Sequence, residues 1–210
     1  KARGFDHGVL EREDVRHLRA DVEMHQAQRG GELGLAELFD GEKDLRRVKA
    51  ELRVVAGGGG PFSDAVRDTQ KIMRFNDTAA HEMALLAMEQ YALALNNLFD
   101  LDLASTISDI EKLHTKGHIA LWRPSPMTLK ASDLNPSWNI TSDSLSAWLA
   151  NQLSASALIL IKSIDIKTTN IISELAADDV IDPSFQDYLK EIPVNIAGPD
   201  CLKNASRLLS

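Results

Sequence analysis

The chain has 210 residues, of which 44% are hydrophobic and 26% charged, and its formal net charge at pH 7 is -8. This acidic balance argues against a general affinity for nucleic acid, and the length allows one substantial core. No apolar run reaches the roughly 20 residues of a membrane span, and no signal peptide is apparent. Cys201 is the only cysteine, which excludes an internal disulfide. We therefore expect a cytoplasmic protein that binds neither nucleic acid nor membrane.

Residues 1–28 form an atypical N-terminal segment. They are rich in Arg, Glu, Asp and His and contain few apolar residues, so they predict at most a peripheral helix. The histidines of this segment are His7, His17 and His25. No cysteine or carboxylate pattern accompanies them, so we interpret them as surface residues and expect no metal site made of protein side chains. A glycine pair, Gly30-Gly31, follows the segment.

A strand, a glycine turn and a helix start follow one another from Leu52 onward. Leu52 to Ala56 is a short apolar run with two β-branched residues, which is typical of a buried parallel strand. The turn consists of Gly57, Gly58, Gly59 and Gly60. Pro61 suits the first position of the helix, and unpaired amides and the helix dipole at such a corner favour an anion. The alternative is a flexible loop that happens to hold many glycines.

A long helix is predicted from Ala79 to Phe99, after a cap at Asp77-Thr78, because this stretch contains neither Gly nor Pro. Its apolar residues occur on nearly all sides, which indicates either a helix buried in the core or half of an oligomer interface. We expect a homo-oligomer that buries part of this helix, and a dimer in particular, since dimers are the commonest symmetric oligomers. His81 and Glu82 near its start face either a site or the surface.

The rest of the chain alternates between helices and strands. Helices are predicted at Ile107–His114, from Thr141 or Ser142 onward, at Ile171–Ala176 and at Pro183–Lys190. Strands are predicted at His118–Trp122, Leu158–Ile161 and Pro193–Ala197. The run Leu158–Ile161 is apolar enough to lie deep in a parallel sheet. This order predicts an α/β protein, a three-layer αβα sandwich around a mostly parallel central sheet.

In parallel sheets ligands bind beyond the carboxyl ends of the strands, and two stretches with reactive side chains lie at such places. From Asn139 to Asp143 an amide, two hydroxyls and a carboxylate occur at a helix start, more groups than capping alone requires. Lys162 directly follows the apolar run, where its ammonium either meets a phosphate or extends to the surface. Asp143 and Lys162 could approach each other in space, with the carboxylate orienting a cation that contacts the phosphate.

Three segments resemble the amino acid kinase family, which includes aspartokinases and uridylate kinases. They are RVVAGGGGPFSDAVRDTQ, AAHEMALLAMEQYALAL and WNITSDSLSAWLANQLSASALILIKSIDI, in this order and spacing. The later segments DVIDPSFQDYL and IPVNIAGP resemble a branch of small kinases of archaea and methylotrophs, similar to the aminomethylfuran-methyl phosphate kinase of methanofuran biosynthesis. The resemblance is most specific in the Thr-Ser-Asp helix at Asp143.

The resemblance implies a kinase that transfers a phosphoryl group from ATP, with Mg2+, to a small acceptor that bears a phosphate or a carboxylate. It also implies a place in the synthesis of a methanofuran-type cofactor. One amino acid kinase-like domain is expected over residues 29–210, with an acceptor lobe over 29–135 and a nucleotide lobe over 136–210. Such chemistry needs positioning and neutralisation of charge more than a nucleophilic side chain.

Matching positions assign roles to individual residues. Gly58 and Gly59 resemble the glycines whose amides face the acceptor and the transferred group, Asn139 resembles the acceptor-binding amide, and Asp143 resembles the aspartate that orients catalytic lysines. The expected catalytic residues are Asp143 and Lys162. The expected acceptor-binding residues are Gly57, Gly58, Gly59, Gly60, Asn139, Thr141 and Ser142. The expected nucleotide-binding residues are Gly30, Gly31, Lys162, Ser163 and Asp165.

The sequence departs from the family pattern around the first glycine pair. The lysine and the serine of the family's Lys-x-Gly-Gly-Ser motif are replaced by Gln28 and Glu32. A carboxylate at that place repels a phosphate. Either Arg29 or Lys162 supplies the missing positive charge, or the segment does not form the usual strand. The second hypothesis is therefore a non-catalytic protein of the same fold that binds or stores an anion or a nucleotide.

Overall fold

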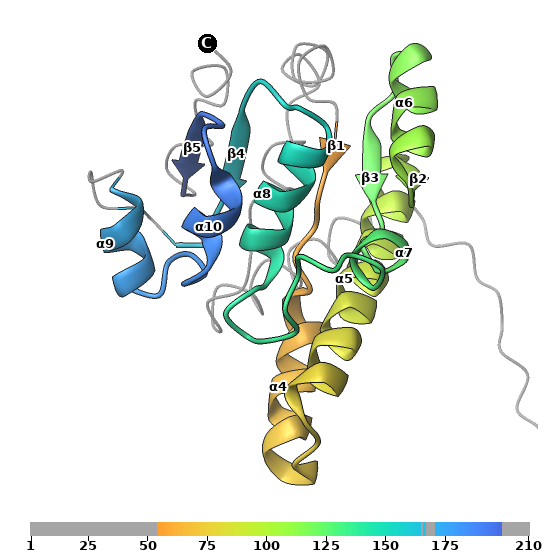
Figure 1. Cartoon of the computed structure of the whole chain (residues 1–210). Helices are drawn as coiled ribbons and strands as arrows, with labels where there is room; N and C mark the ends of the chain where they lie inside the picture. Colours follow the sequence, from red (N-terminus) through yellow and green to blue (C-terminus); the bar gives the residue numbers. More distant parts are fainter. Residues whose placement is uncertain (1–53, 165, 167–170, 199–210) are drawn as a thin grey trace, which may run out of the picture.

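The computed structural model describes residues 54–164, 166 and 171–198, and Figure 1 labels the helices and strands. The strands are β1 (Val54–Val55), β2 (Asp102–Ala104), β3 (Ala120–Trp122), β4 (Leu158–Ile161) and β5 (Val194–Ala197). The helices are α4 (Gly60–Met73), α5 (Asp77–Phe99), α6 (Ile107–Thr115), α7 (Ser125–Thr128), α8 (Ser142–Gln152), α9 (Ile172–Ala177) and α10 (Phe185–Leu189). None of these helices is both long enough and apolar enough to cross a membrane.

All strand pairs in the described chain are parallel. β1, β3 and β2 form a three-stranded sheet in that order, with Val54 opposite Ala120. β4 and β5 form a two-stranded sheet, with Leu160 opposite Ile196. The expected α/β class with parallel strands is confirmed. Sequence reasoning missed β2, because three residues that begin with an aspartate carry no run of β-branched side chains.

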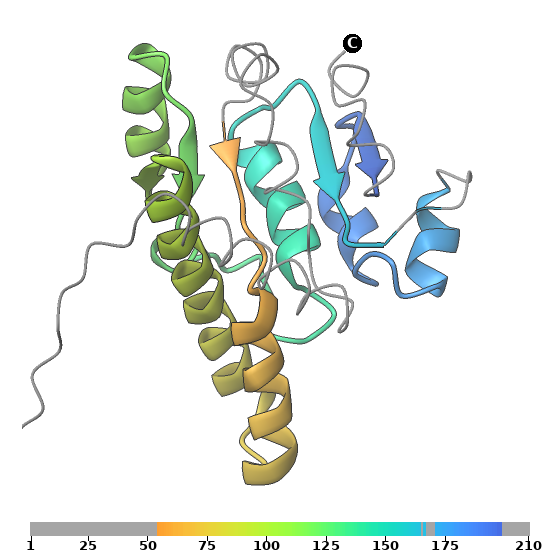
Figure 2. The same ribbon diagram turned by 180° about the vertical axis from the view of Figure 1, so that it is seen from behind.

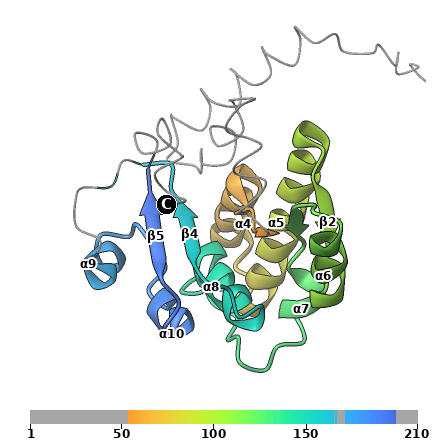
Figure 3. The ribbon, with the colours of Figure 1, turned by 90° about the horizontal axis from the view of Figure 1, so that it is seen from above.

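Helices cover both faces of the three-stranded sheet, as the view from above shows (Figure 3). On one face, Val55 and Leu121 pack with Leu95 of α5. On the other face, Trp122 packs in a cluster that includes Leu145 of α8. Successive side chains of a strand point to opposite faces, so β3 contributes to both halves of the core.

α4 and the first half of α5 form a helical hairpin that extends away from the sheet (Figures 1 and 2). α4 ends at Arg74, whose φ of 58° lies in the left-handed region. α5 begins after Asn76, whose side chain accepts a hydrogen bond from the Ala79 N–H at 2.9 Å. The expected cap at Asp77-Thr78 is wrong, because Asn76 holds the capping position.

α5 confirms the helix expected up to Phe99, and only one of its sides belongs to the core. Its buried apolar residues are Ala80, Leu85, Ala87, Met88, Ala92 and Leu95. Its exposed apolar residues include Met83, Leu86, Leu93 and Leu98. The packing within the described chain therefore accounts for the first set and not for the second.

The last two strands pack with α9 and α10 around Leu160, Leu175 and Phe185. Of the four residues of β4, only Leu160 is buried. The expectation that this strand lies deep in a sheet is therefore wrong for the described chain, in which β4 pairs with β5 alone. The apolar side chains of β4 therefore reflect packing against helices α9 and α10 more than burial at the centre of a sheet.

Several expectations concern residues outside those that the structure describes. They are the segment 1–28, the pair Gly30-Gly31, the departures at Gln28 and Glu32, Asp165 and Cys201. The division into lobes over 29–135 and 136–210 stays a prediction.

Candidate functional site

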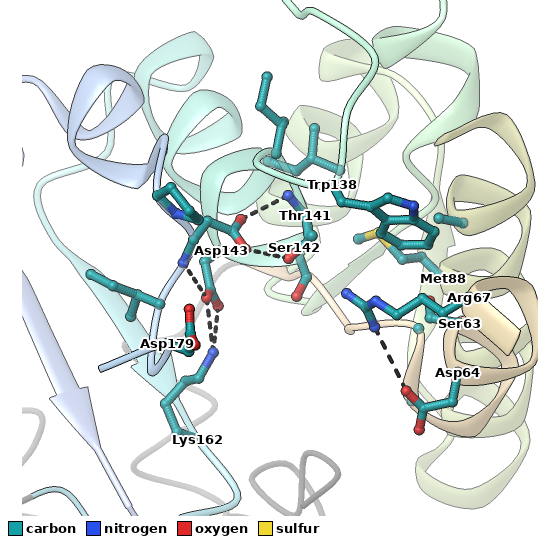
Figure 4. A pocket seen from close by; sticks show the side chains of 18 of the residues that line it. Ser63, Asp64, Arg67, Met88, Trp138, Thr141, Ser142, Asp143, Lys162 and Asp179 are labelled. Atoms are coloured by element: carbon teal, nitrogen blue, oxygen red, sulfur yellow. Dashed lines mark hydrogen bonds and ion pairs between the residues drawn. The ribbon is translucent and has the colours of Figure 1, made fainter. Parts of the chain in front are cut away.

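A cavity of about 400 Å³ lies between the α4–α5 hairpin and the start of α8 (Figure 4). The hairpin wall includes Gly59, Gly60, Ser63 and Arg67. The opposite wall includes Thr141, Ser142, Asp143, Lys162 and Asp182. A cavity of this volume is large enough for a small ligand, and both walls carry charged side chains.

The start of α8 is fixed by a residue from a later part of the chain. The Asp182 carboxylate accepts hydrogen bonds from the Thr141 N–H at 2.7 Å, the Thr141 hydroxyl at 2.5 Å and the Ser144 N–H at 2.9 Å. The expected position of the cap, at Thr141 or Ser142, is confirmed, but the expected capping hydrogen bond is not formed. Thr141 is the residue before α8, but its side chain makes no capping hydrogen bond within the helix. Asp182 takes that role from 38 residues beyond Ser144.

Asp143, in the first turn of α8, faces Lys162 just after β4 (Figure 4). The Lys162 ammonium donates to the two carboxylate oxygens at 2.8 and 3.0 Å. The side chains of Lys162 and Asp143 are only 15% and 8% exposed. The main-chain N–H of Asp182 donates to the same carboxylate at 3.3 Å. The structure thus brings together the two residues that the sequence predicts to be catalytic.

The surroundings of Asp143 oppose its negative charge. Burial raises the pKa of the Asp143 carboxyl, the Lys162 ammonium lowers it in part, and the Asp182 carboxylate raises it again, so that the pKa lies above its ordinary value. The carboxylates of Asp143, Asp179 and Asp182 and the ammonium of Lys162 line this part of the cavity wall. A further cation there would neutralise the excess negative charge.

The hairpin wall carries a guanidinium on an aromatic ring. Arg67 lies over Trp138, 4.4 Å from the centre of its ring, and its guanidinium is 3.6 Å from the Asp64 carboxylate. The Trp138 indole N–H donates to the Gln70 side-chain oxygen at 2.7 Å, which fixes the ring against α4. Ser63, Asp64 and Arg67 lie on one face of α4, because residues three and four apart share a face.

His81 of α5 lines the same cavity and is buried. Burial lowers the pKa of its imidazole, and a hydrogen bond to the main chain of Ser137 and the charge of Glu82 offset this only in part. The ring is therefore neutral at neutral pH and gives the cavity a polar but uncharged group.

Most of the expected site residues in the described chain line the cavity. These are Gly59, Gly60, Thr141, Ser142, Asp143, Lys162 and Ser163. Gly57, Gly58 and Asn139 are not among the lining residues. Gly57 is buried against Tyr91, and Asn139 is exposed, with its main-chain carbonyl accepting from the Ser184 N–H at 3.2 Å. Gly30, Gly31 and Asp165 lie outside the described residues.

Sequence reasoning missed several residues of the cavity wall. They are Ser63, Arg67, Trp138 and Asp182. Helical spacing from Gly60 is a signal that could have identified Ser63 and Arg67. Asp182 gives no local signal, because its partners lie about 40 residues earlier in the chain.

The cavity wall fits phosphate groups better than a metal ion held by protein alone. Among the described residues no group of three or more His, Cys, Asp and Glu side chains could hold a metal ion. The carboxylates of Asp143 and Asp182 are engaged by Lys162 and by the start of α8, so Mg2+ would be held chiefly by phosphates of the substrate. Lys162 provides a point charge for a phosphate, and Gly59 and Gly60 allow close approach of the backbone.

Comparison with curated proteins finds a similar protein that is named as a kinase. No protein-family model matches the chain. The chain is similar to a protein of Methanocaldococcus jannaschii named (5-(aminomethyl)furan-3-yl)methyl phosphate kinase. The two are 26% identical over 187 residues, which cover 82% of this chain and 85% of the relative. Most of the chain is therefore similar to a kinase.

Proposed function

We propose that this protein is a small-molecule kinase of the amino acid kinase fold. It transfers a phosphoryl group from ATP, with Mg2+, to a small acceptor that bears a phosphate or a carboxylate, in the cytoplasm and within the synthesis of a methanofuran-type cofactor. The observation that carries the proposal is the Asp143–Lys162 pair in the wall of a cavity of small-ligand size. The similarity to a kinase over 82% of the chain supports it.

The two paired residues have different roles in this proposal. A lysine ammonium has three N–H donors, and two of those of Lys162 contact Asp143. The third is oriented by this contact and binds an oxygen of the transferring phosphoryl group. Asp143 holds the ammonium in place, since an ionised carboxylate repels phosphate. Bound ATP and Mg2+ supply the phosphoryl group and the charge that bridges its oxygens.

The acceptor occupies the hairpin wall. The amides at Gly59 and Gly60 and the hydroxyl of Ser142 face its anionic group, and Arg67 adds a positive charge. Thr141 lines the opposite wall beside Ser142, and Gly57, Gly58 and Asn139 support the acceptor site from positions near the lining residues. Because the acceptor side comes from the α4–α5 hairpin and Lys162 from the end of β4, the two substrates meet from opposite sides of the cavity.

The nucleotide occupies the side of Lys162 and Ser163. Both residues line the cavity, directly after β4. Gly30, Gly31 and Asp165 complete the nucleotide site in this proposal. This arrangement corresponds to an acceptor lobe over residues 29–135 and a nucleotide lobe over residues 136–210, which together form one domain.

A kinase assay on the full chain tests the proposal. The protein is incubated with ATP, Mg2+ and (5-(aminomethyl)furan-3-yl)methyl phosphate, and the products are followed by 31P NMR and by release of ADP. We expect a new phosphoanhydride signal that grows in step with ADP, is absent without Mg2+ and grows far more slowly with the Asp143→Asn variant.

The same experiment distinguishes a kinase from the alternative, a non-catalytic protein that binds an anion or a nucleotide. That alternative is suggested by Gln28 and Glu32, which replace the lysine and the serine of the family motif. ATP with Mg2+ would then raise the midpoint of thermal unfolding, while neither this phosphate nor a panel of small carboxylates is consumed. A chain that neither binds ATP nor consumes an acceptor contradicts both functions.

A further inference from the structure

Asp182 stands out as a buried charge that no sequence pattern explains. It is 7% exposed, and its carboxylate accepts from three donors at the start of α8, at Thr141 and Ser144. These donors lie 38 and 41 residues earlier in the chain. The segment that carries Asp182, from residue 179 to 183, also lines the cavity.

We propose that Asp182 is a positioning residue that holds the start of α8 in place and thereby keeps Asp143 facing Lys162. The two amides that it binds flank Asp143 in the chain, one before and one after it. Its own main-chain N–H donates to the Asp143 carboxylate at 3.3 Å. Asp182 therefore fixes both the backbone and the side chain of Asp143.

Asp182 provides the acceptor for the amides of Thr141 and Ser144 at the helix start. Thr141, in the capping position, makes no capping hydrogen bond and donates its hydroxyl to Asp182 instead. Ser144 is completely buried, so its N–H cannot turn to water once the carboxylate is removed. Loss of Asp182 therefore leaves a buried donor unsatisfied, and we expect the first turn of α8 to shift or fray.

Charge provides a second link between the two aspartates. The groups that act on the Asp143 carboxyl are Lys162, from the end of β4, and Asp182, from the segment before α10. Removing the negative charge of Asp182 stabilises the ionised form of Asp143, because a like charge has been withdrawn. The pKa of Asp143 then falls, and any activity that needs its ionised form extends to lower pH.

The experiment compares Asp182→Asn and Asp182→Ala with Asp187→Asn in the full chain. Asp187→Asn makes the same change of charge at an exposed position of α10, outside the residues that line the cavity. Hydrogen exchange of the peptide that contains residues 139–146 is measured by mass spectrometry, and this readout needs no activity. We expect faster exchange in Asp182→Ala, a smaller increase in Asp182→Asn, whose amide oxygen can still accept, and no change in Asp187→Asn.

The effect on catalysis rests on the proposed kinase function and is measured separately. We expect kcat to fall about a hundredfold in Asp182→Ala, as for a misplaced catalytic group, with a smaller change in the KM for ATP. Asp182→Asn should retain part of kcat, and the acid limb of its pH–rate profile should move to lower pH. The shift of this limb reports the charge of Asp182, whereas a helix cap without a positioning role would leave kcat unaltered.

The outcomes separate the two proposals. Unchanged exchange at residues 139–146 in Asp182→Ala overturns the positioning role, whether or not the protein is a kinase. If exchange is faster in Asp182→Ala but the wild type has no kinase activity, the positioning role is supported and the proposed function is contradicted. Faster exchange with unaltered kcat shows that Asp182 is a structural cap only and overturns the inference.

Discussion

Lys162 donates hydrogen bonds to both carboxylate oxygens of Asp143, across 19 residues of chain. The two side chains are largely withdrawn from water, so the contact is stronger than a surface ion pair and its geometry is better defined. A lysine held in this way has a fixed orientation, which is what a group that stabilises a transferring phosphoryl requires.

Asp143→Asn tests the value of this charge. We expect kcat to fall by about a hundredfold or more, in line with the loss of a main electrostatic positioning group. The free energy of unfolding should fall by about 3–5 kcal/mol, because the change leaves the largely buried Lys162 ammonium without its charged partner. Steady-state kinetics and urea unfolding measure the two effects. Loss of stability with normal turnover in the folded fraction would show that Asp143 serves the fold alone.

His81→Leu tests the neutral state of the buried imidazole. Burial lowers the pKa of His81 in the folded protein, whereas the unfolded residue has its ordinary pKa of about 6.5. As the pH falls below about 6.5, the unfolded chain therefore binds a proton that the folded chain does not. The wild type should therefore lose stability as the pH falls through this range, and the variant should lack this component. Urea unfolding of both proteins on either side of about pH 6.5 gives the difference. A difference that does not change with pH contradicts the prediction.

Gly59→Ala tests the close packing at the start of α4. The added Cβ would lie 2.7 Å from the Cβ of Ser63 and closer still to its hydroxyl. We expect a loss of about 1–3 kcal/mol of unfolding free energy, typical of overpacking. In the double variant with Ser63→Gly the two changes should compensate in part, as a double-mutant cycle by urea unfolding would measure. If the losses of unfolding free energy in the two single variants simply add in the double variant, the strain does not arise from the contact between residues 59 and 63.

The exposed apolar side of α5 predicts a homodimer. Leu86 and Leu93 are 53% and 50% exposed and lie two turns apart on one side of the helix. Light scattering at micromolar concentration should give a dimer, and the double change Leu86→Glu, Leu93→Glu should give a monomer. Ile72→Glu, near the end of α4, is the control that should keep the dimer, since Ile72 is 81% exposed and belongs to a different helix. A monomeric wild type contradicts the prediction.

The order of the elements from β1 onward, except for β2 and α7, could be predicted from the sequence because it depends on close neighbours. The glycines before Pro61 end a strand and begin a helix, and the stretch up to Phe99 lacks any helix breaker. The placement of Asp143 in the first turn of a helix followed from the same local signals. Hydrophobic periodicity and caps act within about four residues, so a single sequence contains the information.

Tertiary structure alone decided which side chains meet in the cavity. Trp138 is fixed by Gln70, 68 residues earlier, and α8 is capped by Asp182, 38 residues beyond Ser144. Local signals in the sequence predicted a cap by the side chain of Thr141. In the structure the Thr141 hydroxyl instead donates a hydrogen bond to Asp182. A hydroxyl and a carboxylate serve equally well as local caps in the sequence. The choice between them depends on which carboxylate the packing of α10 against α8 brings into reach, and this is a property of the folded chain.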